Sequence, residues 1–159
     1  MGAARMLPAE GKDSPFDGQR RLLIVDDDED FADSLLDLLE PKGYMLRVVT
    51  SAERAHACLK EFDAQVALFD LRLGLASGVD LFAELQAGRP DLVGVIMTAH
   101  VDSKTAIEAL RRGAYDYVDK SCHPGELYAV LDRCFEKLQL QQERSAAYEA
   151  LRVAKDAAE

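Results

Sequence analysis

Acidic, hydroxyl and basic side chains follow four of the five short apolar runs in this 159-residue sequence. An acidic stretch, Asp26–Asp30, follows the first run, and Asp70 follows the third. Thr98-Ala99-His100 follows the fourth run, and Asp119-Lys120 follows the fifth. Clustered carboxylates repel one another, and a hard divalent cation such as Mg²⁺ or Mn²⁺ relieves that repulsion by taking oxygen ligands. If these run ends meet in space, the sequence predicts a metal site beside a potential nucleophile.

The residue types favour phosphoryl transfer as the chemistry of this site. Asp70 ends an apolar run, so its carboxylate is held rigidly and can act as an oxygen nucleophile. Lys120 can pair with one phosphoryl oxygen, and the Thr98 hydroxyl can hydrogen-bond another. Phosphoryl transfer needs mainly positioning and charge neutralisation, which this set supplies. Each residue alone has an ordinary explanation as a cap, strand end or surface charge, but their joint placement favours a site.

The elements that must position these residues alternate along the chain. Five apolar runs predict strands: Leu22–Val25, Leu46–Val49, Val66–Phe69, Val93–Met97 and Tyr115–Val118. Stretches of helical period predict helices at Phe31–Leu39, Ala52–Phe62, Val79–Ala87 and Ser103–Arg112, with a fifth starting near Pro124. Strict alternation predicts an α/β fold, a doubly wound five-stranded parallel sheet with helices on both faces. Right-handed crossovers bring the carboxyl ends of the strands to one edge, where ligands bind in such sheets.

Composition excludes several classes of function. The formal net charge of −10 argues against non-specific nucleic-acid binding, which requires a basic face. No apolar run approaches the roughly 18 residues of a membrane helix, and the first 20 residues lack the apolar segment of a signal peptide. The three cysteines form no C-x-x-C pair, which predicts free thiols in a reducing, cytoplasmic compartment. Cys122-His123 has no second ligand pair at zinc spacing, so no zinc site is predicted.

Residues 21–138 resemble the receiver domain of bacterial two-component response regulators. The matching segments are Leu22–Asp28 (LLIVDDD), Val66–Gly78 (VALFDLRLGLASG), Val95–Ala99 (VIMTA) and Gly113–Lys120 (GAYDYVDK). The resemblance implies a flavodoxin-like strand order, 2-1-3-4-5, and a regulatory phosphoacceptor in place of an enzyme with an external substrate. The phosphoryl group would come from a phosphohistidine donor, either a sensor kinase or a phosphotransfer domain.

The resemblance also implies a role for each candidate residue. Asp70 is the phosphoacceptor, and Thr98 and Lys120 bind the phosphoryl group. Tyr117 is the switch aromatic, which turns inward when Thr98 is drawn to the phosphate. The implied metal ligands are Asp26, Asp27, Asp70 and the main-chain carbonyl of Arg72, and the implied rate-tuning positions are Arg72 and His100. The implied cofactor is Mg²⁺ or Mn²⁺, and the implied readout face is made by the fourth helix, the fifth strand and the fifth helix.

Two loops depart from the pattern of this family. Leu73-Gly74 stands where the family usually has Met-Pro, and Ser121 stands where it usually has proline, commonly after a cis peptide bond. A cis bond without proline costs about 2.5–4 kcal/mol. We therefore predict a trans peptide between Lys120 and Ser121.

The two ends of the chain are predicted to lie outside the receiver. Residues 1–20 are rich in glycine, proline and charge and predict a disordered leader. Residues 139–159 predict a helical extension that links the receiver to an output module after Glu159. A coiled-coil spacing, with Arg144 in the gap, predicts a homodimer through Leu140, Ala147, Leu151, Ala154 and Ala158. The alternative is a solvated last helix.

The output module is open at this stage. Leu151–Glu159 resembles the stretch that leads into the dimerisation helix of hybrid histidine kinases, which suggests a fragment of a longer sensor. A transcriptional regulator and a cyclase-type response regulator are the other candidates.

Other functional classes fit the sequence less well. A Mg²⁺-dependent aspartyl phosphohydrolase of the haloacid-dehalogenase type needs Asp-x-Asp, but Arg72 occupies the position of the second acid. A flavodoxin-type cofactor binder needs a hydroxyl- and glycine-rich loop after the first strand, where this chain has Asp26-Asp27-Asp28. A degenerate receiver that works without phosphate is disfavoured by the intact set of acids, Thr98 and Lys120.

Overall fold

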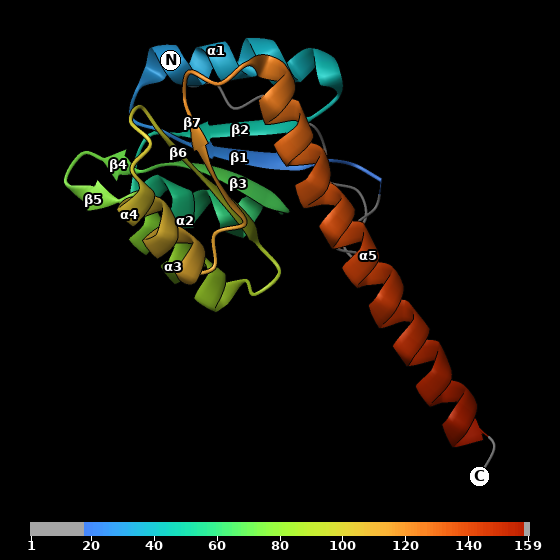
Figure 1. Cartoon of the computed structure of the whole chain (residues 1–159). Helices are drawn as coiled ribbons and strands as arrows, with labels where there is room; N and C mark the ends of the chain where they lie inside the picture. Colours follow the sequence, from blue (N-terminus) through green and yellow to red (C-terminus); the bar gives the residue numbers. More distant parts are fainter. Residues whose placement is uncertain (1–17, 158–159) are drawn as a thin grey trace.

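A five-stranded parallel sheet with helices on both faces organises residues 18–157, which the computed structural model describes (Figure 1). The strands are β1 (Arg21–Val25), β2 (Met45–Val49), β3 (Val66–Asp70), β6 (Val93–Thr98) and β7 (Asp116–Asp119). Their order in the sheet is β2-β1-β3-β6-β7. Counted along the chain, this is the predicted order 2-1-3-4-5, and the predicted fold class is confirmed. An additional two-stranded hairpin, β4 (Arg72–Leu73) and β5 (Ala76–Ser77), was not predicted.

The predicted helices are all present, with boundaries within a few residues of those expected. They are α1 (Glu29–Leu39), the short 3₁₀ helix η1 (Glu40–Lys42), α2 (Ala52–Glu61), α3 (Gly78–Gly88), α4 (Ser103–Arg111) and α5 (Pro124–Ala157). Side chains cap the first four α-helices by accepting hydrogen bonds from free main-chain amides of the first turn: Asp28, Ser51, Ser77 and Asp102. Asp28, Ser51 and Asp102 lie in loops that follow strands, whereas Ser77 is the last residue of β5, so each cap fixes where its helix begins.

Alternate strand residues fill two separate cores, one on each face of the sheet. Leu22, Ile24 and Leu68 pack with α1 and α5 on one face. Leu23 and Phe69 pack with α2, α3 and α4 on the other. Because both faces of the central strands are buried, their ends are held rigidly, and side chains placed there have little freedom to move.

Helix α5 packs on the domain over its first half and then continues into solvent (Figure 1). Its buried side chains end at Leu138, whereas Leu140 is 65% exposed and Leu151 is 67% exposed. The predicted C-terminal helical extension is therefore present up to Ala157. One of the residues predicted to contact a second chain, Ala158, lies outside the described residues.

The predicted leader lies mostly outside the described residues, which begin at Gly18. Arg20, at the end of that segment, donates a hydrogen bond to Asp132 at 2.6 Å and stacks 5.2 Å from the ring centroid of Phe135. This contact ties the start of β1 to α5. Within residues 18–157, no helix is both long enough and apolar enough to cross a membrane.

Candidate functional site

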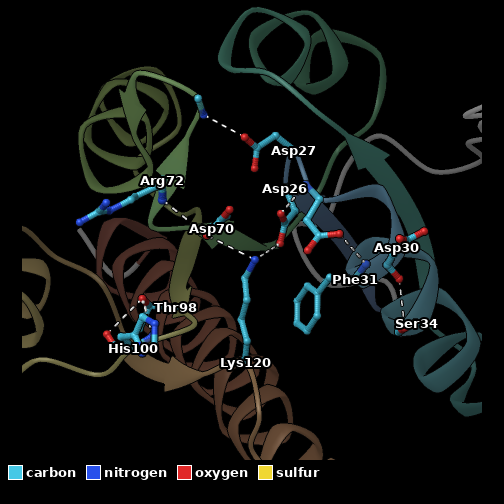
Figure 2. A network of polar contacts seen from close by, with 12 residues as sticks. Asp26, Asp27, Asp30, Phe31, Ser34, Asp70, Arg72, Thr98, His100 and Lys120 are labelled. Carbon is cyan, nitrogen blue, oxygen red and sulfur yellow. Dashed lines mark hydrogen bonds and ion pairs between the residues drawn. The ribbon is translucent and has the colours of Figure 1, made fainter.

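The carboxyl ends of four strands bring the candidate residues together at one edge of the sheet (Figure 2). Asp26 directly follows β1, Asp70 is the last residue of β3, and Thr98 is the last residue of β6. Lys120 directly follows β7, and its main-chain amide donates to the Thr98 carbonyl at 2.8 Å. The expected convergence of acids, hydroxyl and ammonium on one rim therefore occurs.

Three carboxylates form the acidic part of the site. Carboxylate oxygens of Asp26, Asp27 and Asp70 lie within 4.8 Å of one another. Asp26 is only 2% exposed, Asp70 is half-buried and Asp27 is exposed. Main-chain amides hold all three: Asp28 donates to Asp26 Oδ1 at 2.9 Å, and Arg72 to Asp70 Oδ1 at 3.4 Å. In the same way, Gly74 donates to Asp27 Oδ2 at 3.0 Å.

The charge of Lys120 offsets part of this acidity. Its Nζ lies 2.8 Å from Asp26 Oδ2 and 3.4 Å from Asp70 Oδ1, and it stacks 4.5 Å from the ring centroid of Phe31. Burial alone would lower the pKa of Lys120, but the hydrogen bonds and charges of Asp26 and Asp70 outweigh it and raise that pKa. Lys120 is thus held in its charged form at the centre of the cluster.

The acidic cluster fits a hard divalent cation. Burial, with the charge of Asp26 added to it, raises the pKa of Asp70 to about 6 despite the opposing charge of Lys120. One ammonium faces three carboxylates, so the cluster keeps a negative charge that a divalent cation would balance. Oxygen ligands from carboxylates are those that Mg²⁺ and Mn²⁺ prefer. The guanidinium of Arg72 points away from Asp70 (Figure 2), and the role of its carbonyl as a ligand stays a prediction.

Thr98 is the last residue of β6, and Tyr117 lies in the neighbouring strand β7, where its partner in the register is Ile96. The buried Thr98 hydroxyl donates to the His100 carbonyl at 3.2 Å and accepts from the His100 amide at 3.3 Å (Figure 2). The Tyr117 hydroxyl is buried and has no hydrogen-bond partner within residues 18–157. Burial raises the pKa of the Tyr117 phenol, so it stays neutral. The side chain of His100 is on the exposed rim.

Two contacts at the rim were missed from the sequence. Gly74 supplies a main-chain donor to Asp27, and Asp119 Oδ1 accepts hydrogen bonds from the amide and hydroxyl of Ser121 at 2.7 and 2.6 Å. Both donors stand where the resembled family usually has proline, which has no amide hydrogen. The absence of proline at Gly74 and Ser121 was the feature of the sequence that could have indicated these hydrogen bonds. The predicted trans peptide after Lys120 is confirmed, since no cis peptide bond occurs among the described residues.

Comparisons with known proteins point to one family. The sequence model of the response regulator receiver domain matches residues 22–132. The alginate biosynthesis transcriptional regulatory protein AlgB of Pseudomonas putida is 33% identical over 144 residues, which are 91% of this chain and 32% of that protein. This chain therefore spans less than half the length of AlgB.

Two solved structures extend the comparison to three dimensions. A CheY-like response regulator receiver domain protein from Methanospirillum hungatei has a TM-score of 0.69 and 30% identity, covering 80% of this chain and 99% of that one. A response regulator from Burkholderia pseudomallei, solved with a phosphorylated aspartic acid, a calcium ion and citrate, has a TM-score of 0.66 and 29% identity. That match covers 84% of this chain and 75% of the other.

Proposed function

The chain belongs to the response regulator receiver domain family, and we propose that it is a switch in which Asp70 accepts a phosphoryl group with the help of a divalent cation. A receiver domain is the regulatory input of a two-component response regulator. The observation that carries the proposal is the placement of Asp70 between two further carboxylates and the ammonium of Lys120. On this view the chain catalyses only its own phosphorylation and dephosphorylation.

The cation would be Mg²⁺ or Mn²⁺, held by Asp26, Asp27, Asp70 and the main-chain carbonyl of Arg72. When bound, it neutralises charge on the transferring phosphoryl oxygens. Lys120 pairs with one of these oxygens and the Thr98 hydroxyl donates to another. The Burkholderia response regulator, with its phosphorylated aspartic acid and calcium ion, supports this assignment, because Ca²⁺ also takes hard oxygen ligands.

The donor we propose is a phosphohistidine of a sensor kinase or phosphotransfer domain in the cytoplasm. The N–P bond of the donor breaks as an Asp70 oxygen forms the new O–P bond, and the leaving histidine nitrogen takes a proton. An apolar groove beside Lys120 supports docking of such a donor. It is lined mainly by α1 and the start of α5, through Phe31, Ser34, Leu35, Leu38, Met97, Lys120, Cys122, Pro124 and Leu127.

The readout we propose runs through Thr98 and Tyr117. Phosphorylation would draw the Thr98 hydroxyl from its bonds with His100 toward the phosphoryl group. The buried Tyr117 hydroxyl would then acquire a new environment, and the face made by α4, β7 and α5 would repack. Arg72 and His100, which are exposed at the rim, would tune how fast the phosphoryl group is gained and lost.

The output we favour is transcriptional regulation by a module after Glu159. The supporting observation is that the AlgB protein, which matches 91% of this chain, is a transcriptional regulator more than twice as long as the matched region. We further propose that the C-terminal helix pairs with its copy in a second chain. A hybrid kinase or a cyclase-type regulator would use the same helix to reach another output.

Intact mass after incubation with acetyl phosphate tests the function. We expect one phosphoryl mass gain in the presence of Mg²⁺, none in EDTA and none in Asp70→Asn. Full labelling of Asp70→Asn, or labelling unaffected by EDTA, would refute the assignment. Many turnovers of p-nitrophenyl phosphate would instead favour the aspartyl phosphohydrolase.

A further inference from the structure

The loop after β7 carries Lys120 between two residues that are bonded to each other. We propose that Asp119 and Ser121 are positioning residues, which set the location of Lys120 in the site. The inference rests on the proposed function for its consequence, but its structural part can be tested separately. Neither residue touches the phosphoacceptor, so they would act only through Lys120.

Hydrogen bonds on both sides of Lys120 fix its main chain. On one side, the Lys120 amide donates to the Thr98 carbonyl at 2.8 Å, which continues the ladder between β6 and β7. On the other side, Asp119 Oδ1 accepts from both the amide and the hydroxyl of Ser121, at 2.7 and 2.6 Å. The Asp119 carbonyl also accepts from the Cys122 amide at 3.0 Å. The chain therefore turns tightly at Lys120.

The location of the main chain matters because the lysine stem is flexible. A lysine side chain has several freely rotating bonds, so it cannot set its own position. Its ammonium lies 2.8 Å from Asp26 and 3.4 Å from Asp70, and these contacts leave Lys120 only 15% exposed. A shift of the turn would move the ammonium out of reach of one carboxylate or of the incoming phosphoryl group.

Asp119 is suited to this task by its charge state. The hydrogen bonds from Ser121 lower its pKa, so the carboxylate remains an acceptor at neutral pH. Ser121 is exposed, so burial in a core does not account for the hydrogen bond that its hydroxyl donates to Asp119. The bonds thus serve the geometry of the turn that carries Lys120.

Two measurements on the whole chain test the proposal with Asp119→Ala, Ser121→Ala and the conservative Ser121→Thr. The first is the reactivity of individual lysines toward acetic anhydride, read by peptide mass spectrometry. The second is the initial rate of phosphorylation by acetyl phosphate with Mg²⁺. Ser51→Ala is the matched control, because it removes a similar local bond, to the Arg54 amide at 3.2 Å, at the N-terminus of α2.

We expect Asp119→Ala and Ser121→Ala to raise the labelling of Lys120 severalfold and to leave the distant Lys60 unchanged. Asp119→Ala should slow phosphorylation about tenfold, because a misplacement of about 1 Å near a reacting centre costs up to about a hundredfold. Ser121→Thr, which keeps both donors, should behave as the wild type does, and so should Ser51→Ala.

The outcomes separate this inference from the proposed function. Unchanged Lys120 labelling in Asp119→Ala overturns the inference, and so does an equal rise at Lys60, which would report general loosening. If labelling of Lys120 rises but the wild type takes no phosphoryl group, the positioning role stands and the proposed function fails. If the wild type is phosphorylated and Asp119→Ala is phosphorylated equally fast, the positioning role fails alone.

Discussion

Lys120 lies closer to Asp26 than to the proposed phosphoacceptor. The distance from Lys120 Nζ is 2.8 Å to Asp26 Oδ2 and 3.4 Å to Asp70 Oδ1. The ammonium therefore serves first to neutralise the most buried acid of the cluster. A cation bound to Asp26 would take over that task and leave Lys120 available to a phosphoryl oxygen.

Removal of the Lys120 charge should therefore separate metal binding from phosphorylation. We expect Lys120→Met to bind Mg²⁺ more tightly, by roughly tenfold or about 1.4 kcal/mol, because the ammonium no longer competes for Asp26. The same variant should be phosphorylated more slowly, since the phosphoryl oxygens lose their partner. Titration calorimetry and acetyl phosphate labelling measure the two effects, and Lys120→Arg, which keeps the charge, is the control. Weaker Mg²⁺ binding in Lys120→Met would contradict the competition.

Metal binding should stabilise the folded chain. A cation at about 100 times its dissociation constant adds roughly 2.7 kcal/mol if it binds only the native state. Asp27→Asn should remove most of that gain, because the exposed Asp27 is a proposed ligand. Without metal, the same variant should be more stable than the wild type, because repulsion among the carboxylates is reduced. Thermal melting with and without Mg²⁺ measures both effects. A wild-type melting curve that ignores millimolar Mg²⁺ would count against the site.

The raised pKa of Asp70 predicts how stability depends on pH without metal. Its pKa is about 6 in the folded chain, against an ordinary value near 4, so the native state holds a proton more tightly than the unfolded state. The associated stability is complete below about pH 4 and is lost as pH rises through about 6, up to about 3 kcal/mol in total. Asp70→Asn cannot titrate, so its stability relative to wild type should rise from pH 4 to pH 7.

Urea unfolding of both proteins in EDTA across that range isolates the contribution of this one carboxylate. A constant difference between the two would show that Asp70 titrates normally. Saturating Mg²⁺ should abolish the advantage of Asp70→Asn at pH 7, since the cation then stabilises the ionised wild type.

The strand ends were predictable from the sequence, but the contacts between side chains were not. Apolar runs bounded by polar residues determine where each strand ends, and the parallel topology brings these ends to one edge of the sheet. The positions of Asp70 and Thr98 at strand ends on that edge were therefore predicted correctly. The partner of Lys120 depends on distances that differ by less than 1 Å, which no spacing encodes. The hairpin β4–β5 was not predicted because its strands have only two residues each, too few to show an alternating pattern. Its turn signal, Gly74 with a φ of 60°, is meaningful only once the pairing of Leu73 with Ala76 is known.

Gly78 should be intolerant of any side chain because it lies against the main chain of Asp70. A Cβ atom at Gly78 would lie 2.0 Å from the Asp70 carbonyl oxygen. Gly78→Ala must therefore shift the backbone that carries Asp70, and we expect a loss of about 1–3 kcal/mol together with slower phosphorylation. Gly88→Ala at the other end of α3 is the control, since nothing lies within 4 Å of its Cβ position. We expect it to be neutral or stabilising by about 0.4–1 kcal/mol. Equal stability of the two variants in urea would contradict the close approach.

The C-terminal helix offers an apolar stripe that turns away from the domain. At about 100° per residue, Leu140, Ala147, Leu151 and Ala154 share one side of α5, whereas Val153 points to nearly the opposite side. Leu140 and Leu151 are 65% and 67% exposed, and Val153 is 56% exposed. The stripe is thin, because alanine buries little area and Arg144 interrupts it, so pairing should be weak and dependent on concentration.

Matched substitutions on the two sides of α5 test whether this stripe joins two chains. We expect sedimentation over a concentration series to show a monomer–dimer equilibrium for the whole chain. A charge on the stripe must be desolvated or must face its own copy in the dimer, so Leu151→Asp should abolish association. Val153→Asp introduces the same charge on nearly the opposite side of the helix and should leave association unchanged. A chain shortened to end at Leu138 should be monomeric, because its remaining α5 side chains pack within the domain. If Leu151→Asp and Val153→Asp associate equally, or if the shortened chain still dimerises, the contact between chains lies elsewhere, and the α4–β7–α5 face becomes the first place to substitute.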